Sequence, residues 1–192
     1  MASPELIYRI YHALHAHAAE VRAFEESRGE KVSGTLTLLC DGDPARPLAR
    51  WGEEMQELCG VLDGTHDDSY LMESTQVFYW GSLYGALRGA TWESLAFEAQ
   101  RAKAATAIAS VGELRSAAER LVALGPGAAP PDKLFMLWNA ADWIYRRSVP
   151  AEQQWSIDQL MAADLAEMRK RSYLLPIIAM VQRDLTSRRA RG

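Results

Sequence analysis

The chain has 192 residues, 48% of them apolar, which is enough to bury one sizeable core or two small ones. Its formal net charge of −4 argues against a general affinity for nucleic acid or for anionic membranes. No apolar run has the length needed to cross a bilayer, and we expect no signal peptide. Cys40 and Cys59 lie among apolar neighbours, which favours buried free thiols. We therefore expect a cytoplasmic protein with no nucleic-acid or membrane partner.

The first half of the chain predicts helices separated by short breaks. Ser3 can cap a first helix that has Pro4 at its first position. Residues 29–47 are interrupted by Gly, Asp and Pro and predict an irregular connection, within which 34–40 is a loop or a short helix. Further helices are expected over 48–62, over 66–89 and from a cap at Thr91 onwards.

The second half also predicts helices, and its clearest loop is the Gly- and Pro-rich stretch 125–131. The expected helices are 111–124, 132–147, 151–171 and 172–188. With no convincing strand in either half, the sequence predicts an all-α protein.

Four oxygen-bearing side chains stand out on two neighbouring predicted helices. Glu54 and Glu57 are three residues apart and share one helix face, as do Glu73 and Gln76 on the next helix. A short turn makes the two helices antiparallel neighbours, so the two pairs can converge. Oxygen ligands that meet at one point, most of them anionic, suit a hard cation such as Mg²⁺.

Acids in such a pattern are also common on solvated helix faces. Glu73 favours a site, because it lies in an otherwise apolar helix and an unpaired buried charge is costly. Asp67 and Asp68, before it, are interpreted as charges at a helix N-terminus that border the suspected site.

The order and spacing of these residues resemble the MazG-like nucleotide pyrophosphohydrolases, and more closely their phosphoribosyl-ATP branch. The metal-binding signature of that superfamily is Glu-Glu-x-x-Glu, followed after a gap by Glu-x-x-Asp. The resemblance covers about residues 5–105. The residues that carry it are Ser33, Thr35, Gly42, Arg50, Glu53, Glu54, Glu57, Glu73, Gln76 and Tyr79.

The resemblance implies an antiparallel helical bundle that hydrolyses a phosphoribosyl-ATP-like substrate or a nucleoside triphosphate to the monophosphate and pyrophosphate. It implies Mg²⁺ as the cofactor, with Mn²⁺ as an alternative, and a homodimer as the assembly. The implied metal ligands are Glu54, Glu57, Glu73 and Gln76, and the implied catalytic residues are Glu53, Glu54 and Glu57. Arg50 stands where the family has a Lys and is expected to contact a substrate phosphate.

Two positions depart from the family pattern. Gln76 replaces an Asp, which leaves three negative charges among the four ligands, and Trp80 replaces a His. These departures keep a second interpretation open, in which the chain is a catalytically degenerate helical protein of the same fold that acts in nucleotide sensing or assembly.

The resemblance divides the chain into a pyrophosphohydrolase-like domain over 1–108 and a helical extension over 109–192. Glu119, Asn139 and Asp142 faintly repeat the arrangement of the first half. The extension is therefore a possible degenerate second copy, packed with the first as a tandem bundle of about eight helices. The alternative is that any two amphipathic helices look alike.

Overall fold

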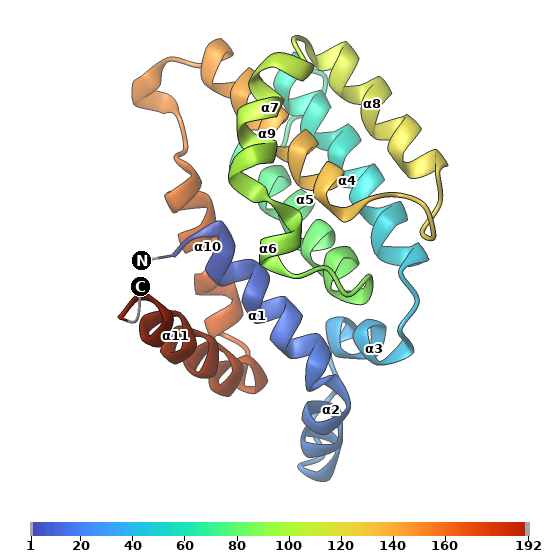
Figure 1. Cartoon of the computed structure of the whole chain (residues 1–192), viewed down its shortest axis with the longest axis vertical. Coiled ribbons are helices and arrows are strands. Elements are labelled where there is room, and N and C mark those ends of the chain that lie inside the picture. Colours follow the sequence, from blue (N-terminus) through green and yellow to red (C-terminus); the bar gives the residue numbers. More distant parts are fainter. Residues whose placement is uncertain (1, 191–192) are drawn as a thin grey trace. The chain divides into compact units, whose positions relative to one another are not determined.

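The computed structural model describes residues 2–190, and every regular element in that range is a helix (Figure 1). The prediction of an all-α protein is confirmed. Contacts group the chain into two compact units, residues 44–156 and residues 1–43 together with 157–192. The expected boundary at 108/109 therefore falls inside one of these units. Within residues 2–190, no helix is long and apolar enough to cross a membrane.

The unit formed by residues 44–156 is built on two helical hairpins, α4–α5 and α8–α9. Within it, α4 packs against α5 and α8, and α9 packs against α5, α7 and α8 (Figure 1). Its helices are α4 (Ala45–Asp63), α5 (Tyr70–Leu87), α6 (Trp92–Leu95), α7 (Phe97–Ala107), α8 (Val111–Ala123), α9 (Pro131–Ser148) and the 3₁₀ turn η1 (Ala151–Gln153).

The turn between α4 and α5 brings the two acid-bearing helices side by side. Gly64 ends α4 with φ of +77°, a left-handed conformation that glycine adopts without strain. Ser69 begins α5, and its hydroxyl accepts a hydrogen bond from the backbone N–H of Met72 at 3.2 Å. The helix thus starts four residues later than the predicted residue 66, and residues 65–69 are free to form a turn.

Aromatic side chains fill the centre of this unit. Phe78 of α5 makes edge-to-face contacts with Phe135 and Trp138 of α9, with ring centroids 5.3 and 5.0 Å apart. Trp138 is 1% exposed, and its indole N–H donates to the carbonyl oxygen of Ser74 at 2.9 Å and lies 3.0 Å from the Ser74 hydroxyl. These contacts tie α9 to the helix that carries Glu73.

Replacing Trp138 by Phe keeps an aromatic ring and removes the N–H donor. The buried oxygens of Ser74 then lose a partner. We expect the free energy of unfolding, measured in urea, to fall by about 1–2 kcal/mol. Trp143→Phe on the same helix is the control, because Trp143 is 39% exposed, and it should change stability by less than about 0.5 kcal/mol. Equal effects of the two substitutions would contradict this account of the core.

Asp142, one of the residues that suggested a second copy, has structural partners, as does Arg115 of the same half. Asp142 accepts two hydrogen bonds from Arg146, at 2.8 and 3.0 Å, and one from the Tyr70 hydroxyl at 3.3 Å. Arg115 of α8 pairs with Asp63 of α4 at 2.7 Å. Asp142 and Arg115 therefore hold the two hairpins together. A true internal repeat stays a prediction.

The other unit contains the two terminal parts of the chain. Here α1 packs against α3, α10 and α11, and α2 packs against α3. Its helices are α1 (Pro4–Ala16), α2 (Ala18–Ser27), α3 (Gly34–Asp41), α10 (Ile157–Arg169), the 3₁₀ turn η2 (Ser172–Leu174) and α11 (Leu175–Arg189).

Local capping explains several of the predicted helix ends. The Ser3 hydroxyl accepts from the Leu6 N–H at 3.3 Å and begins α1. Thr91 and Ser94 form a reciprocal capping box at α6, as the Thr91 cap predicted. For residues 34–40 the short helix is confirmed over the loop, because Ser33 caps α3 and Gly42 ends it with φ of +71°. The helix predicted over 151–171 instead consists of η1, a break and α10.

Candidate metal centre

Helix α4 presents two of the predicted ligands on one face. Glu54 and Glu57 are three residues apart and share one face of α4, and a carboxylate oxygen of Glu57 lies within 4.8 Å of one of Glu73 on α5. Glu54 is 4% exposed, whereas Glu57 is exposed. The face therefore carries one buried and one accessible carboxylate.

Helix α5 supplies a third carboxylate from a more deeply buried position. Glu73 is 2% exposed, and its Oε2 atom makes no hydrogen bond with any described residue. A buried carboxylate oxygen without a partner is costly, because burial removes its water and nothing replaces it. The expectation that Glu73 lies buried in an apolar helix is confirmed, and its free oxygen calls for a cation or a donor.

The turn between α4 and α5 adds a residue that the sequence interpretation left without a role. The backbone N–H groups of Thr65 and His66 donate to the carbonyl oxygen of Gly60, at 2.8 and 3.1 Å. A Cβ atom on Gly60 would lie 2.7 Å from the Cβ of His66. Glycine at position 60 is therefore what lets the turn fold back and carry the imidazole toward Glu73.

Glu57, His66 and Glu73 each offer one ligand atom, and these three atoms lie within 4.8 Å of one another. The His66 Nε2 atom is 3.9 Å from Glu73 Oε1. It is also 3.0 Å from Asp68 Oδ2, at an angle that makes no hydrogen bond. We call Glu57, His66 and Glu73 the acidic–imidazole cluster.

Burial and like charges shift the proton affinity of this cluster. The pKa of Glu73 is raised to about 7, chiefly by burial and then by the neighbouring carboxylates Glu57, Glu54 and Asp68, while His66 acts to lower it. Burial also raises the pKa of Glu54, against the opposing effect of Arg50. Carboxylates that repel one another at a shared site are stabilised by a bound cation.

Arg50 lies one turn before the carboxylates of α4 and contacts them directly. It forms ion pairs with Glu53 and Glu54, and its guanidinium carbon lies 5.6 Å from the centroid of the Trp80 ring. Glu53 is exposed. In this structure the residue predicted to contact a phosphate is thus engaged by the chain's own acids. Glu54, a predicted metal ligand, pairs with Arg50 and is not one of the three residues of the cluster.

Gln76 lies one turn beyond Glu73 on α5 and is half-buried. That spacing places it on the same helix face as Glu73, as predicted. Its role as a fourth ligand stays a prediction.

The donor set of the cluster, two carboxylates and one imidazole, suits a divalent cation of the Mg²⁺, Mn²⁺ or Zn²⁺ type. No family model matches the chain, and neither a curated protein nor a solved structure is found to be similar to it. The residues of the cluster are therefore the basis on which a function can be inferred.

The role of Gly60 gives a prediction about the position of His66. In Gly60→Ala, the new Cβ atom forces His66 to shift. We expect the affinity for Mn²⁺ to fall about 10-fold, which is typical when a residue that positions a metal ligand is replaced. Alanine has a higher helix propensity than glycine by about 1 kcal/mol, which offsets part of the strain from this close contact. The variant should therefore still fold. Titration with Mn²⁺ measures the effect.

Gly52→Ala is the matched control for this prediction. A Cβ atom there would lie 2.8 Å from Cγ2 of Val122, so the substitution crowds α8 and leaves the turn alone. It should change the Mn²⁺ affinity less than about twofold. Similar losses in both variants would mean that crowding of α4, and not the position of His66, governs binding.

Proposed function

We propose that the chain hydrolyses a nucleotide polyphosphate, of the phosphoribosyl-ATP or nucleoside triphosphate type, to the monophosphate and pyrophosphate in a Mg²⁺- or Mn²⁺-dependent reaction. The observation that carries the proposal is the acidic–imidazole cluster, whose three ligand atoms lie within 4.8 Å of one another. The free buried oxygen of Glu73 supports it, because that oxygen needs a cation or a donor.

The residues of the cluster and the residues around it have different proposed roles. Glu57, His66 and Glu73 hold the cation, and Gln76 adds an amide oxygen from the next turn of α5. When bound, the cation neutralises and polarises the polyphosphate. Glu53 is exposed and orients the attacking water, while Arg50 leaves the α4 carboxylates to pair with a substrate phosphate.

The substrate class is supported by the resemblance over residues 5–105. This resemblance depends on the order of the acids on α4 and α5 and on the basic residue that precedes them. The two helices that carry these acids pack side by side, as a shared metal site requires. A homodimer is part of the same proposal, and the molar mass measured by light scattering tests it.

The test is release of pyrophosphate by the full chain. The protein is incubated with Mg²⁺ or Mn²⁺ and with phosphoribosyl-ATP and each common ribo- and deoxyribonucleoside triphosphate, and pyrophosphate and monophosphate are quantified together. We expect equimolar formation of both products from at least one substrate, and none after chelation of the cation. Failure to release pyrophosphate from every substrate would refute the enzymatic proposal.

A second proposal is a catalytically degenerate protein of the same fold that senses a nucleotide or acts in assembly. It is favoured by the contacts of Arg50, which pairs with Glu53 and Glu54 and stacks on Trp80. In that case a nucleotide with Mg²⁺ raises the melting temperature without turnover, because ligand binding stabilises the folded state. Gln76→Asp should enlarge the increase, since it adds a negative charge.

A further inference from the structure

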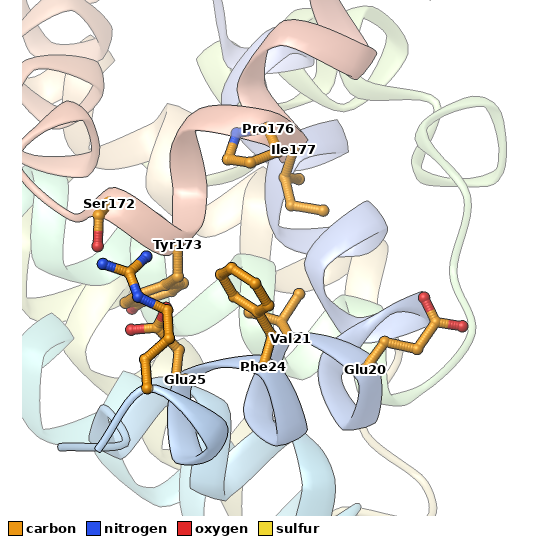
Figure 2. Close-up of a pocket in the computed structure, with 9 residues that line it drawn as sticks. Glu20, Val21, Phe24, Glu25, Ser172, Tyr173, Pro176 and Ile177 are labelled. Atoms are coloured by element: carbon orange, nitrogen blue, oxygen red, sulfur yellow. The ribbon is translucent and has the colours of Figure 1, made fainter. Parts of the chain in front are cut away.

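A pocket of about 200 Å³ lies in the unit formed by residues 1–43 and 157–192. Its walls come from α2 on one side and from η2 and the start of α11 on the other. Figure 2 shows Phe24 rising from α2 toward Pro176 and Ile177, with Glu25 below Tyr173 and Glu20 turned away. The pocket is distinct from the acidic–imidazole cluster, which belongs to the other unit.

Glu25 is the unusual residue of this pocket. It is 5% exposed, although the residues on either side of it on α2 are exposed, and its Oε1 atom has no hydrogen-bond partner among the described residues. Its backbone is held in place, because its carbonyl oxygen accepts from the N–H groups of Arg28 and Glu30 at 3.1 and 3.0 Å. Glu25 lines the pocket, and a ligand that donates a hydrogen bond to its buried, unpaired carboxylate oxygen would offset the cost of that burial.

Besides Glu25, the pocket is lined by the polar residues Glu20, Arg28 and Ser172 and by aromatic and aliphatic side chains. Val21, Pro176 and Ile177 contribute aliphatic surface, and the ring of Phe24 is 57% exposed. The guanidinium carbon of Arg28 lies 5.5 Å from the centroid of that ring, so the Phe24 face already contacts a cation. Arg28 also lies 4.0 Å from Glu30, a carboxylate outside the pocket.

We propose that this pocket binds a small primary amine with an aromatic or branched alkyl group. The ammonium group donates to Glu25 Oε1, and the apolar group packs against Phe24 and Ile177. A charged donor is favoured over a neutral one, because hydrogen bonds between ammonium and carboxylate groups are stronger than neutral ones. The volume is enough for about one ring, since a cavity of about 150 Å³ accepts benzene.

The test compares three ligands of one shape by NMR titration of the full ¹⁵N-labelled chain at pH 7. The probes are benzylamine, benzyl alcohol and benzoate. We expect benzylamine to shift the amide signals of Val21, Phe24, Tyr173 and Ile177 and to bind at least about 10-fold more tightly than benzyl alcohol, with benzoate weakest. Equal affinity for benzylamine and benzyl alcohol would overturn the proposal.

Two variants locate the ammonium contact. Glu25→Gln keeps the shape of the side chain and removes its charge, so benzylamine should bind about 10-fold more weakly while benzyl alcohol is unaffected. Glu20→Gln is the matched control, because Glu20 is an exposed carboxylate at the same pocket, and it should change the affinity less than about twofold. Unchanged binding of benzylamine to Glu25→Gln would refute the role of Glu25.

A third variant tests the pocket independently of Glu25. Ile177→Trp fills the space from α11 and should remove the binding of both benzylamine and benzyl alcohol. Retained binding in this variant would place the ligand elsewhere and overturn the proposal.

Discussion

Glu57→Ala is expected to lower the rate of pyrophosphate release at least about 100-fold, because the one clustered ligand atom that α4 would supply to the cation is lost. Glu57 is exposed, so its loss should leave the fold intact and the melting temperature of the ion-free protein nearly unchanged. The control is Glu119→Ala, which removes an exposed carboxylate from α8 of the same unit and should retain full activity. Normal turnover by Glu57→Ala would remove Glu57 from the site.

The site inferred from the structure includes His66, whereas the site predicted from the sequence does not. In the acidic–imidazole cluster, His66 is a ligand, and His66→Ala should lower activity as strongly as Glu57→Ala does. In a site made only of Glu54, Glu57, Glu73 and Gln76, the same substitution would change activity only a few-fold. The rates of the two variants under saturating Mn²⁺ distinguish these arrangements.

Glu73→Gln is expected to stabilise the ion-free protein at pH 8 while it weakens cation binding. The pKa of Glu73 is raised from 4.5 to about 7, so its contribution to stability is fully present below about pH 4.5 and is lost as the pH rises through 7. At pH 8 the carboxylate is charged, buried and surrounded by other acids. Glutamine has no charge to bury, and the gain at pH 8 should be about 1–3 kcal/mol.

The measurement is urea unfolding of wild type and Glu73→Gln at pH 5 and pH 8 in the presence of a chelator. The difference in unfolding free energy should be small at pH 5 and should favour the variant at pH 8. Saturating Mn²⁺ should shift the difference toward the wild type, because the wild type binds the ion more tightly and gains more binding energy. Glu119→Gln serves as the control for removal of an exposed charge, because Glu119 lies outside the cluster. A difference that is the same at both pH values would contradict the assigned pKa shift.

The sequence contains much of the information about the helices because their ends are set locally. Ser3, Ser33 and Thr91 cap their helices with their own hydroxyls, within three residues along the chain. The helical spacing of Glu54, Glu57 and Glu73 predicted which faces they occupy, and the apolar neighbours of Glu73 indicated its burial.

Other features depend on contacts that no local pattern encodes. The turn that carries His66 depends on the close approach of Gly60, and the sequence marks neither residue as part of a site. The boundaries of the two units arise because residues 157–192 return to residues 1–43, which is a long-range arrangement. Glu25 lies on a polar helix, and only the structure shows that it is buried and that it lines a pocket with residues of η2 and α11.

Binding of Mn²⁺ followed by electron paramagnetic resonance tests the central claim most directly, because the ion reports both its occupancy and its nitrogen ligands. We expect one Mn²⁺ per chain, with a ¹⁴N coupling that disappears in His66→Ala, and an affinity that falls more than about 10-fold in Glu73→Gln. Absence of saturable Mn²⁺ binding, or an affinity and a spectrum unchanged by both substitutions, would contradict a cation site formed by Glu57, His66 and Glu73.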